Sequence, residues 1–383
     1  MRPEAAAIVE ERVNLTLTEE QEELRASVRR FLADKAPSEA VRRWMDSEEG
    51  HDPTLWKQMA GQLGLQGLAI PEEHGGAGYG PVELGIVLEE LGRALTPTPF
   101  FATVALAGQA LVHSGDTAAQ ARWLPAIADG TLTATLALSE ERGGAALDAV
   151  TTSAVRDGDG WALTGTKMFV VDGASADLVL LVARADEGLG LFAVEAGAAG
   201  MTRTPLDALD LTRRLGRIDV DATPAQRVGT AGDATEFLQR ALDLAVVALA
   251  HEQVGGASAC LDTAVEYAKI RVQFDRPIGS FQAIKHKCAD LLVEVESARS
   301  AAYSAAWAAA EDPAELPVAA ALAGSYCSEA YTHAAKENIQ IHGGIGYTWE
   351  HDAHLFLKRA KSSELLFGTP VRHRARLADL IGI

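Results

Sequence analysis

The C-terminal third of the chain contains the stretch that decides the fold, Gln340-Ile341-His342-Gly343-Gly344-Ile345-Gly346-Tyr347, followed by Arg359-Ala360-Lys361 and Leu366-Phe367-Gly368-Thr369. Gly343 and Gly344 let a backbone come close to a bound group, because no Cβ stands in the way. The two glycines follow a segment with helical periodicity and not a strand, so they do not form the G-x-G-x-x-G turn of a Rossmann fold. The stretch therefore argues against a doubly wound nucleotide-binding sheet.

Composition limits the classes of protein that the chain can represent. Its 383 residues, 48% of them hydrophobic, can build a large core and two or three domains. The net charge of −19 argues against nucleic acid and anionic membrane surfaces as partners. Cys260, Cys288 and Cys327 lie far apart and form no CxxC pair, which indicates neither a zinc site nor a disulfide framework and fits a reducing cytosol. We find no apolar run of the roughly 18–20 residues that a membrane span requires, and Met1–Arg12 has no signal-peptide pattern and is expected to be partly disordered.

The apolar pattern divides the chain into three blocks, for which we predict domains at residues 15–132, 133–233 and 234–383. The first block is helical, with a helix start at Thr18-Glu19-Glu20-Gln21 and a later helix over 82–95. The second has short runs rich in Val, Thr and aromatic residues, which predict an antiparallel, hairpin-rich sheet with strands over 151–155, 161–164, 167–171 and 178–182. The third returns to alanine-rich helical periodicity over 237–269, 282–311 and 318–342. Helices, then a sheet, then helices predict a segregated α+β fold.

The order of the motifs resembles that of a known family. Arg271-Val272-Gln273-Phe274 followed by Gln282, then the Gly343-Gly344 stretch, then Leu366–Thr369, occur as they do in the acyl-CoA dehydrogenases, flavoenzymes that make 2,3-enoyl-CoA. The resemblance covers about residues 15–380. It implies an N-terminal helical domain, a central antiparallel β domain and a C-terminal four-helix bundle. It also implies FAD as the cofactor, an acyl-CoA substrate, and a cytoplasmic oligomer that takes part in fatty acid or steroid degradation.

The same resemblance assigns residues to FAD. On the phosphate side it implies roles for Arg271, Gln273, Phe274, Gln282, Gln340, Gly343 and Gly344, and a pyrophosphate does need a fixed cation and close backbone N–H donors. In the family these groups reach across an interface to the neighbour's flavin, which implies a homo- or hetero-dimer or tetramer. On the sheet side it assigns Ser139, Phe169 and Val171 to the flavin ring. Val171 stands where a threonine is usual and cannot donate that hydrogen bond.

Both positions at which the family carries its catalytic glutamate are apolar. Phe367 immediately precedes the Gly-Thr pair, and Ala245 lies 26 residues before Arg271. Abstraction of a proton next to a thioester carbonyl needs a carboxylate whose pKa is raised toward neutrality by burial. Three nearby acids are alternatives, each better explained as a solvated or helix-capping carboxylate: Asp243, Glu252 and Glu364. The identity of the base therefore stays open.

The histidines do not supply a metal site. His251-Glu252 begins like H-E-x-x-H, but Gly255 occupies the fifth position. His351 and His354 lie three residues apart without a third ligand, and His342 lies next to the glycine pair, where a cofactor contact is an alternative to a purely structural role. We expect no metal.

Two functional hypotheses remain. In the first, the chain is one subunit of a hetero-oligomeric acyl-CoA dehydrogenase, in which it is a non-catalytic partner. In the second, it is a self-sufficient homo-oligomer that uses an unassigned carboxylate or runs another reaction, such as flavin monooxygenation. Ala245 and Val246 favour large acyl groups, although Phe367 takes up volume nearby. The family implies an electron-transferring flavoprotein as the electron acceptor.

Overall fold

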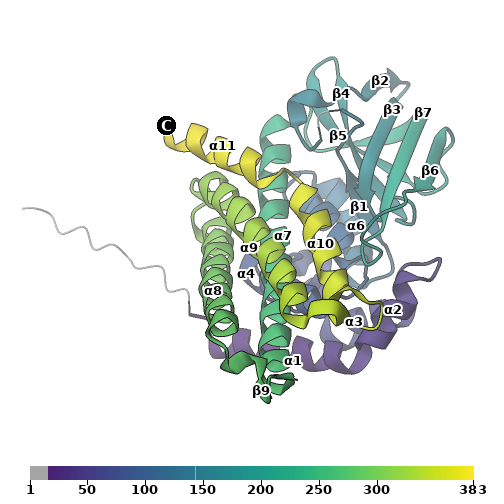
Figure 1. The fold of residues 1–383 in the computed structure, drawn as a ribbon. Coiled ribbons are helices and arrows are strands. Elements are labelled where there is room, and N and C mark those ends of the chain that lie inside the picture. The colour runs from purple at the N-terminus through teal and green to yellow at the C-terminus, as the bar shows by residue number, and fades with distance from the viewer. Residues whose placement is uncertain (1–15, 143) are drawn as a thin grey trace, which may run out of the picture.

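The computed structural model describes residues 16–142 and 144–383, so the expectation for Met1–Arg12 lies outside the described residues. Figure 1 shows the N- and C-terminal helices packed together, with the strands gathered in one lobe beside them. This arrangement confirms the predicted order of helices, sheet and helices.

The N-terminal helices begin and end at residues whose chemistry explains the boundary. Thr18 caps the first helix, and Gln21 completes the predicted capping box. Gly64 ends the third helix in the left-handed conformation. The helices are α1 (Glu19–Lys35), α2 (Ser38–Met45), α3 (Pro53–Leu63), α4 (Pro81–Arg93), a π-helix (Phe101–Gly108), α5 (Gln109–Val112) and α6 (Thr117–Ala128), with 3₁₀ turns at Leu65–Gly67 and Glu72–His74.

The strands are β1 (Ala134–Ala137), β2 (Ser153–Asp157), β3 (Gly160–Val171), β4 (Leu178–Ala185), β5 (Gly188–Glu195), β6 (Met201–Pro205) and β7 (Leu215–Val228). The pairings run from β4 through β2, β3, β7 and β5 back to β4, so the sheet closes on itself. Most pairs are antiparallel as predicted, but β1 and β2 both run parallel to β4. The two strands predicted over 161–164 and 167–171 were wrong: they form the single strand β3, which absorbs the polar interruption at Gly165 as an irregularity in its register with β7.

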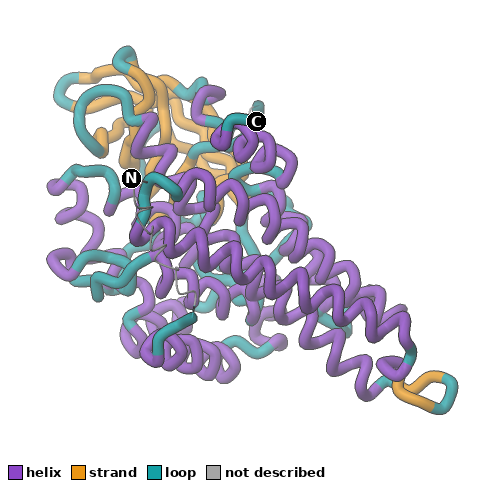
Figure 2. The backbone as a smooth tube through the Cα atoms, turned by 90° about the vertical axis from the view of Figure 1, so that its left-hand side faces the viewer, coloured by secondary structure: helices purple, strands orange, loops and turns teal. Residues whose placement is uncertain are grey.

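The C-terminal block consists of α7 (Thr235–Ile270), α8 (Gln282–Glu311), α9 (Leu316–His342), α10 (Ala353–Leu365) and α11 (Pro370–Ile381). The bounds of α7, α8 and α9 agree with the three helical periods to within two residues. A two-stranded hairpin, β8 (Val272–Gln273) and β9 (Arg276–Pro277), joins α7 to α8. Figure 2 shows this hairpin at the far end of the long helices, away from the closed sheet.

Two glycines bring α4 and α7 into backbone contact. A Cβ at Gly255 would lie 1.8 Å from the carbonyl oxygen of Glu89, and one at Gly92 would lie 2.1 Å from that of Glu252. No side chain fits either place, so these glycines set the distance between the N-terminal and C-terminal helices. That contact positions Glu252 for the polar cluster described below.

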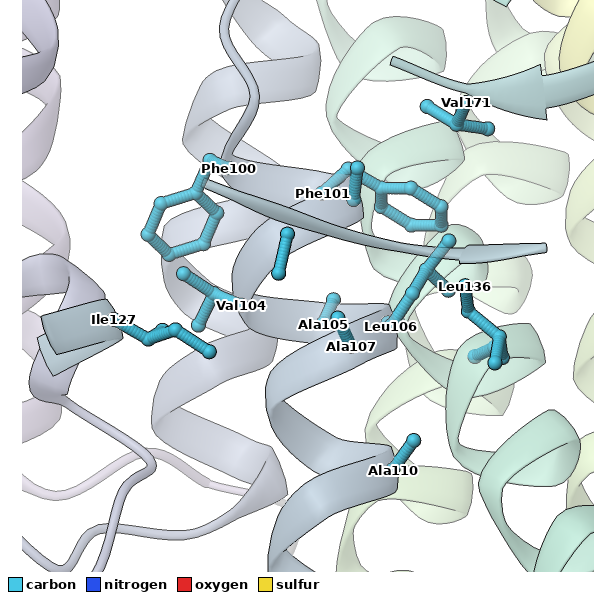
Figure 3. Close-up of a cluster of buried hydrophobic side chains, with 14 of the residues drawn as sticks. Phe100, Phe101, Val104, Ala105, Leu106, Ala107, Ala110, Ile127, Leu136 and Val171 are labelled. Atoms are coloured by element: carbon cyan, nitrogen blue, oxygen red, sulfur yellow. The ribbon is translucent and has the colours of Figure 1, made fainter. Parts of the chain in front are cut away.

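The π-helix contributes side chains to the hydrophobic core that lies between the helices and the sheet. Figure 3 shows Phe101 and Leu106 on the side of this helix that faces Leu136 of β1 and Val171 of β3. The Thr103 hydroxyl fixes the helix to β1 through bonds with the backbone of Ala134, at 3.1 Å to its oxygen and 3.0 Å to its nitrogen. Helices with i→i+5 bonding often occur at functional sites.

Helix α7 corrects one expectation from the sequence. Its length and composition alone would allow it to cross a membrane, although we found no such run in the sequence. Its most apolar window is entirely buried in the fold, so α7 is a core helix.

Candidate functional site

An apolar pocket of about 420 Å³ lies between the closed sheet and the C-terminal end of α10. Its walls come from the segment that follows β1, from the end of β3, from the loop between β6 and β7, and from residues 361–367. Because four separate segments converge here, a ligand in this pocket would contact both the sheet and the C-terminal helices.

The three residues predicted to face a flavin ring line this pocket together. Val171 is 4% exposed, whereas Phe169 is 51% exposed and its backbone has a φ of +57°. Ser139 is held next to β3 because its carbonyl oxygen accepts a 2.8 Å bond from the amide of Met168. The Phe169 ring thus presents an aromatic face at the rim, while Val171 contributes only apolar surface deeper in the wall.

A buried ion pair that sequence reasoning missed fixes the segment around Ser139. The Lys167 ammonium group donates to Glu140 at 2.7 Å and to the carbonyl oxygen of Leu138 at 3.1 Å. Burial would raise the pKa of Glu140, but hydrogen bonds from Lys167, Thr151 and Thr152 outweigh it and hold the pKa at about 2. Burial lowers the pKa of Lys167 to about 8 against the attraction of Glu140. The pair joins the segment after β1 to β3, the two elements that carry Ser139 and Phe169.

The other predicted cofactor residues lie elsewhere in the chain. Arg271, Gln273, Phe274, Gln282, Gln340, Gly343 and Gly344 all lie in exposed positions around the hairpin tip and the end of α9. The ends of α7, α8 and α9 are held together by one small apolar cluster that includes Ala268, Ile284 and Ile341. Figure 2 places the tip at the opposite end of the helices from the sheet, so within one chain these residues do not meet the pocket.

The tip is open to a partner or ligand. The Arg271 side chain makes no hydrogen bond or ion pair among the described residues, and Gln273 bonds only to the neighbouring backbone oxygen of Val272. Apart from chain neighbours, no atom lies within 4 Å of the place that a Cβ would take on Gly343 or Gly344. Phe274 is 86% exposed.

The two positions that could hold a catalytic base are packed with apolar groups. Ala245 is fully buried in the core that joins α7 to the N-terminal helices. Phe367 lines the apolar pocket in a left-handed conformation with a φ of +56°, and its ring centroid lies 6.3 Å from that of Phe101.

The three alternative acids are each engaged by cations. Asp243 pairs with Arg376 through both carboxylate oxygens, and Glu364 accepts bonds from Lys361 at 2.6 Å and Thr332 at 2.8 Å. Burial would raise the pKa of Glu252 and of Glu364, but the neighbouring cations outweigh it and lower both. A low pKa makes Glu252 and Glu364 weak bases, and Arg376 occupies both carboxylate oxygens of Asp243, so none of the three matches the demand of α-proton abstraction.

Sequence reasoning did not single out two aspartates that line the pocket. Asp210 is buried, and its oxygens are taken by Arg359 at 2.8 Å and by the amide of Thr212 at 2.9 Å. Asp207 is exposed and makes no hydrogen bond or ion pair among the described residues. Asp207 is therefore the carboxylate of the pocket wall whose oxygens are available.

Behind the pocket lies a buried cluster of charges that joins all three parts of the fold. Arg359 of α10 donates to Glu252 of α7 at 2.9 Å and to the carbonyl oxygen of Thr212 at 2.7 Å. Arg213 pairs with the same Glu252 and also donates to Ser363 at 3.2 Å. Burial opposes the charge of Arg359, but Asp210 and Glu252 outweigh it and raise its pKa. For Arg213, burial is the stronger effect and lowers the pKa.

The neighbouring Arg214 extends this connection to the N-terminal helices. Its guanidinium donates to the backbone oxygens of Ser47 at 2.5 Å and Met45 at 3.0 Å. The loop that carries Arg213 and Arg214 thus contacts α2, α7 and α10 at once, and its residues 206–210 line the apolar pocket. Charged residues in a loop usually face solvent, but Arg213 and Arg214 connect the domains of this protein.

Asp172 lies next to this cluster and is the basis of a pH-dependence prediction. Burial raises its pKa to about 7, against the opposing influence of Arg213, Arg359 and Arg214. A carboxyl whose pKa is higher in the folded state contributes stability at low pH, and that contribution is lost as the pH rises through about 7. We therefore compare the free energy of unfolding of Asp172→Asn with that of the parent protein at two pH values. The difference, variant minus parent, should be about 1–3 kcal/mol larger at pH 8 than at pH 5.

Urea unfolding of both proteins at the two pH values measures this difference. Asp186→Asn, in an exposed turn of the same sheet, is the matched control. An effect of Asp172→Asn that is equal at pH 5 and pH 8 would show that Asp172 does not titrate between these values.

The structure shows the surroundings of the three histidines His342, His351 and His354. His342 is buried, its Nδ1–H donates to the backbone oxygen of Asn338 at 2.8 Å, and its ring stacks on Tyr267 with a ring separation of 4.2 Å. The ring of His351 lies 4.2 Å from that of His342, and His354 packs against Trp349. Within residues 16–142 and 144–383, no group of three or more His, Cys, Asp or Glu side chains could hold a metal ion.

Comparison with known proteins agrees with this architecture. Family models described as the acyl-CoA dehydrogenase N-terminal, middle and C-terminal domains match residues 18–131, 135–214 and 232–381. The acyl-CoA dehydrogenase IpdE2 of Mycolicibacterium smegmatis is 38% identical over 94% of this chain and 98% of its own length. The acyl-CoA dehydrogenase FadE34 of Mycobacterium tuberculosis is 40% identical over 90% of this chain, but the match covers only 45% of that protein.

Two solved structures are similar over almost the whole chain. The ChsE4-ChsE5 complex from Mycobacterium tuberculosis gives a TM-score of 0.89 at 31% identity, over 96% of this chain and 99% of that one. The Tcur3481-Tcur3483 steroid ACAD gives a TM-score of 0.88 at 36% identity, with the same shares covered. Together with the three family models in their order along the chain, these likenesses establish that the chain belongs to the acyl-CoA dehydrogenase family of flavoprotein oxidoreductases.

Proposed function

We propose that the chain is a subunit of a hetero-oligomeric, FAD-dependent acyl-CoA dehydrogenase, and that a second subunit of the same fold supplies the catalytic base. The observation that carries the proposal is the apolar character of both base positions, where Phe367 lies against Phe101 and Ala245 is fully buried. A carboxylate cannot be recruited there by a change of rotamer, because the neighbouring acids Asp243, Glu252 and Glu364 are held by cations.

FAD fits the residues of the chain in two places. The apolar pocket has an aromatic face at Phe169 and a hydroxyl at Ser139, which suit a flavin ring. The hairpin tip offers Arg271, which has no partner within residues 16–142 and 144–383, together with the unobstructed backbone of Gly343 and Gly344, and these groups suit a pyrophosphate. Since the two places lie at opposite ends of one chain, we propose that the tip serves the flavin of a neighbouring subunit.

Two likenesses support a partner that differs from this chain. Two of the similar solved structures carry the names of pairs of proteins, the ChsE4-ChsE5 complex and the Tcur3481-Tcur3483 steroid ACAD. More than half of FadE34 lies outside its match to this chain, which leaves room there for a second unit of similar size. The exposed apolar surface at Phe274, Tyr347 and Trp349 supplies an interface for such a partner.

In such an enzyme, FAD supplies the hydride acceptor when it is bound. The residues of this chain bind and orient: Ser139 and Phe169 hold the ring, and the apolar wall with Val171, Leu136 and Phe367 excludes water from the acyl group. The acyl groups that suit this pocket are large and apolar, as in the degradation of fatty acids or steroids. We place the enzyme in the cytoplasm, where its free cysteines stay reduced, and propose an electron-transferring flavoprotein as its electron acceptor.

A homo-oligomer that uses Asp207 as its base, or that carries out another flavin reaction, is the second candidate. Asp207 favours it, because this carboxylate lines the pocket and has no internal partner among the described residues. An anaerobic titration with short, long and steroid-like acyl-CoAs separates the candidates. Bleaching of the flavin absorption by the chain alone would establish the homo-oligomer, whereas bleaching only after a partner subunit is added would establish the hetero-oligomer.

The tip gives a second, structural test. We expect Arg271→Ala to weaken FAD binding by the assembled enzyme roughly 10- to 100-fold, because a charge-assisted bond to phosphate contributes about 1.5–3 kcal/mol. The dissociation constant of FAD, followed by flavin fluorescence, is the readout. Arg374→Ala removes an exposed arginine that pairs with Glu329 and is the matched control. Equal FAD affinity of the two variants would exclude a phosphate contact at Arg271.

A further inference from the structure

Behind the apolar pocket lies a small polar recess with a volume of about 20 Å³, enclosed by all three parts of the fold. Its walls include Thr96 and Thr98 from the turn after α4, Asp172 from the end of β3, and Arg213 and Arg214 from the loop before β7. A space of this size holds one group as large as a water molecule.

Several polar atoms around the recess have no hydrogen-bond partner among the described residues. The hydroxyls of Thr96 and Thr98 and the Nε of Arg214 are buried and make no hydrogen bond among the described residues, and Thr96 is only 4% exposed. The Asp172 carboxylate also has no hydrogen-bond or ion-pair partner there. An unpaired buried hydroxyl costs roughly 1–3 kcal/mol, so several at one place indicate a bound group that satisfies them together.

The backbone conformation at Thr96, Thr98 and Asp172 directs their side chains toward the recess. Leu95 has a left-handed φ of +52°, and the amide of Thr96 bonds back to the oxygen of Leu91 at 3.2 Å, which turns the chain toward the interior. Thr98 lies between two prolines that restrict its backbone further. On the opposite wall, Asp172 has a φ of +53°, and its amide donates to the oxygen of Arg214 at 2.9 Å.

The charges around the recess select a neutral ligand. Three arginines and two carboxylates line the recess, namely Arg213, Arg214 and Arg359 with Glu252 and Asp172, and Asp210 pairs with Arg359 from outside this wall. An anion would therefore meet no net positive charge and would face Asp172 directly. A hydroxyl suits the recess better, because it can donate to the carboxylate and accept from a threonine or from the Nε of Arg214.

The recess adjoins the apolar pocket close to Phe367, the place that the family's base would occupy. Phe367 lines the apolar pocket and contacts Phe101, which lines the recess and lies under the Arg213 guanidinium at 5.0 Å. Val171 lines both spaces. Val171 and Phe101 therefore form the boundary between the recess and the part of the apolar pocket next to Phe367.

We propose that this recess binds a hydroxyl group carried by the acyl chain, several carbons from the thioester, and thereby makes the pocket selective for hydroxylated acyl-CoA. The inference rests on the proposed function, since it needs an acyl-CoA in the apolar pocket. Thr96 and Thr98 are its specificity-determining residues. A water molecule fills the recess when the acyl chain lacks the hydroxyl.

Calorimetric binding of matched acyl-CoA pairs tests the proposal. The probes are hexanoyl-, octanoyl- and decanoyl-CoA, each with its ω-hydroxy counterpart, titrated into the chain alone and into the assembled enzyme. We expect one hydroxylated probe to bind about 5- to 10-fold more tightly than its unsubstituted partner, as one or two satisfied hydrogen bonds would give. Because the probes differ in length, the preferred one also reports the depth of the recess.

Two threonine variants locate the effect. Thr96→Val removes the hydroxyl with little change of shape and is expected to abolish the preference. Thr223→Val is the matched control, because Thr223 is also fully buried with an unpartnered hydroxyl but lies on β7, outside the recess. Since only this chain is mutated, a lost preference is assigned to its own pocket even when a partner is present.

The outcomes separate this inference from the proposed function. Equal affinities within every pair, or a preference that survives Thr96→Val, would overturn the hydroxyl site and leave the acyl-CoA pocket in place. No binding of any acyl-CoA to the chain or to the assembled enzyme would overturn both.

Discussion

Phe367→Glu is expected to give the chain the base that it lacks. The variant should exchange the hydrogens next to the thioester carbonyl of a bound acyl-CoA roughly 10²- to 10⁴-fold faster than Phe367→Gln, which is the contribution of a positioned general base. The backbone at this position is fixed in the left-handed region, followed by Gly368 and the cap of α11, so the new side chain starts from the same place as the phenyl ring. Its surroundings include Phe101 and other apolar groups, and burial of a carboxyl in such a site raises the pKa toward neutrality.

The measurement is uptake of deuterium from D₂O into the acyl group, followed by mass spectrometry, in protein with and without added FAD. Exchange needs only the base, so it separates proton abstraction from hydride transfer. Phe367→Gln has the same shape without a basic oxygen, and Phe367→Leu keeps the apolar character. If the glutamate variant binds acyl-CoA but exchanges no faster than the glutamine variant, the pocket does not place the α-carbon next to residue 367, and the base position inferred from the resemblance is wrong for this chain.

The helices were predictable because their signals are local. Alanine-rich periodicity located α7, α8 and α9, and the Thr18 capping chemistry located the start of α1. Strand β3 was harder, because Gly165 interrupts its apolar alternation and looks like a turn in the sequence. Its pairing with β7 supplies the hydrogen bonds that carry the strand through this interruption, and such pairing is not visible in one segment alone.

The candidate site also has features that the sequence could indicate and features that it could not. The resemblance grouped Ser139, Phe169 and Val171, which no spacing rule would connect, and these three residues line one pocket. It could not indicate the buried cluster of Arg213 and Arg359, because charged residues in a loop or on a helix usually face solvent. Burial of these arginines depends on the simultaneous contact of α7, α10 and the loop before β7, a tertiary arrangement without a local signature.

Glu252→Ala should be the most destabilising single substitution that we predict, with a loss of about 3–5 kcal/mol in the free energy of unfolding. Glu252 accepts from both Arg213 and Arg359, so its removal leaves two buried guanidinium groups without their shared carboxylate. Glu252→Gln keeps one acceptor oxygen and should cost less. The matched control is Glu329→Ala, which breaks an exposed pair with Arg374 and should cost about 0–1 kcal/mol.

Chemical unfolding of the three variants measures these differences, and acyl-CoA binding to the folded variants measures their consequence for the pocket. Arg359 lies on α10 and Arg213 on the loop before β7, and both elements also form walls of the apolar pocket. If the cluster fixes the separation of these walls, Glu252→Gln will weaken acyl-CoA binding while the protein remains folded, and Glu329→Ala will not. A Glu252→Ala variant as stable as the parent would mean that the two arginines reach water or other acceptors once the carboxylate is gone. In that case the cluster would be a consequence of how the three parts of the fold pack rather than the contact that holds them in place.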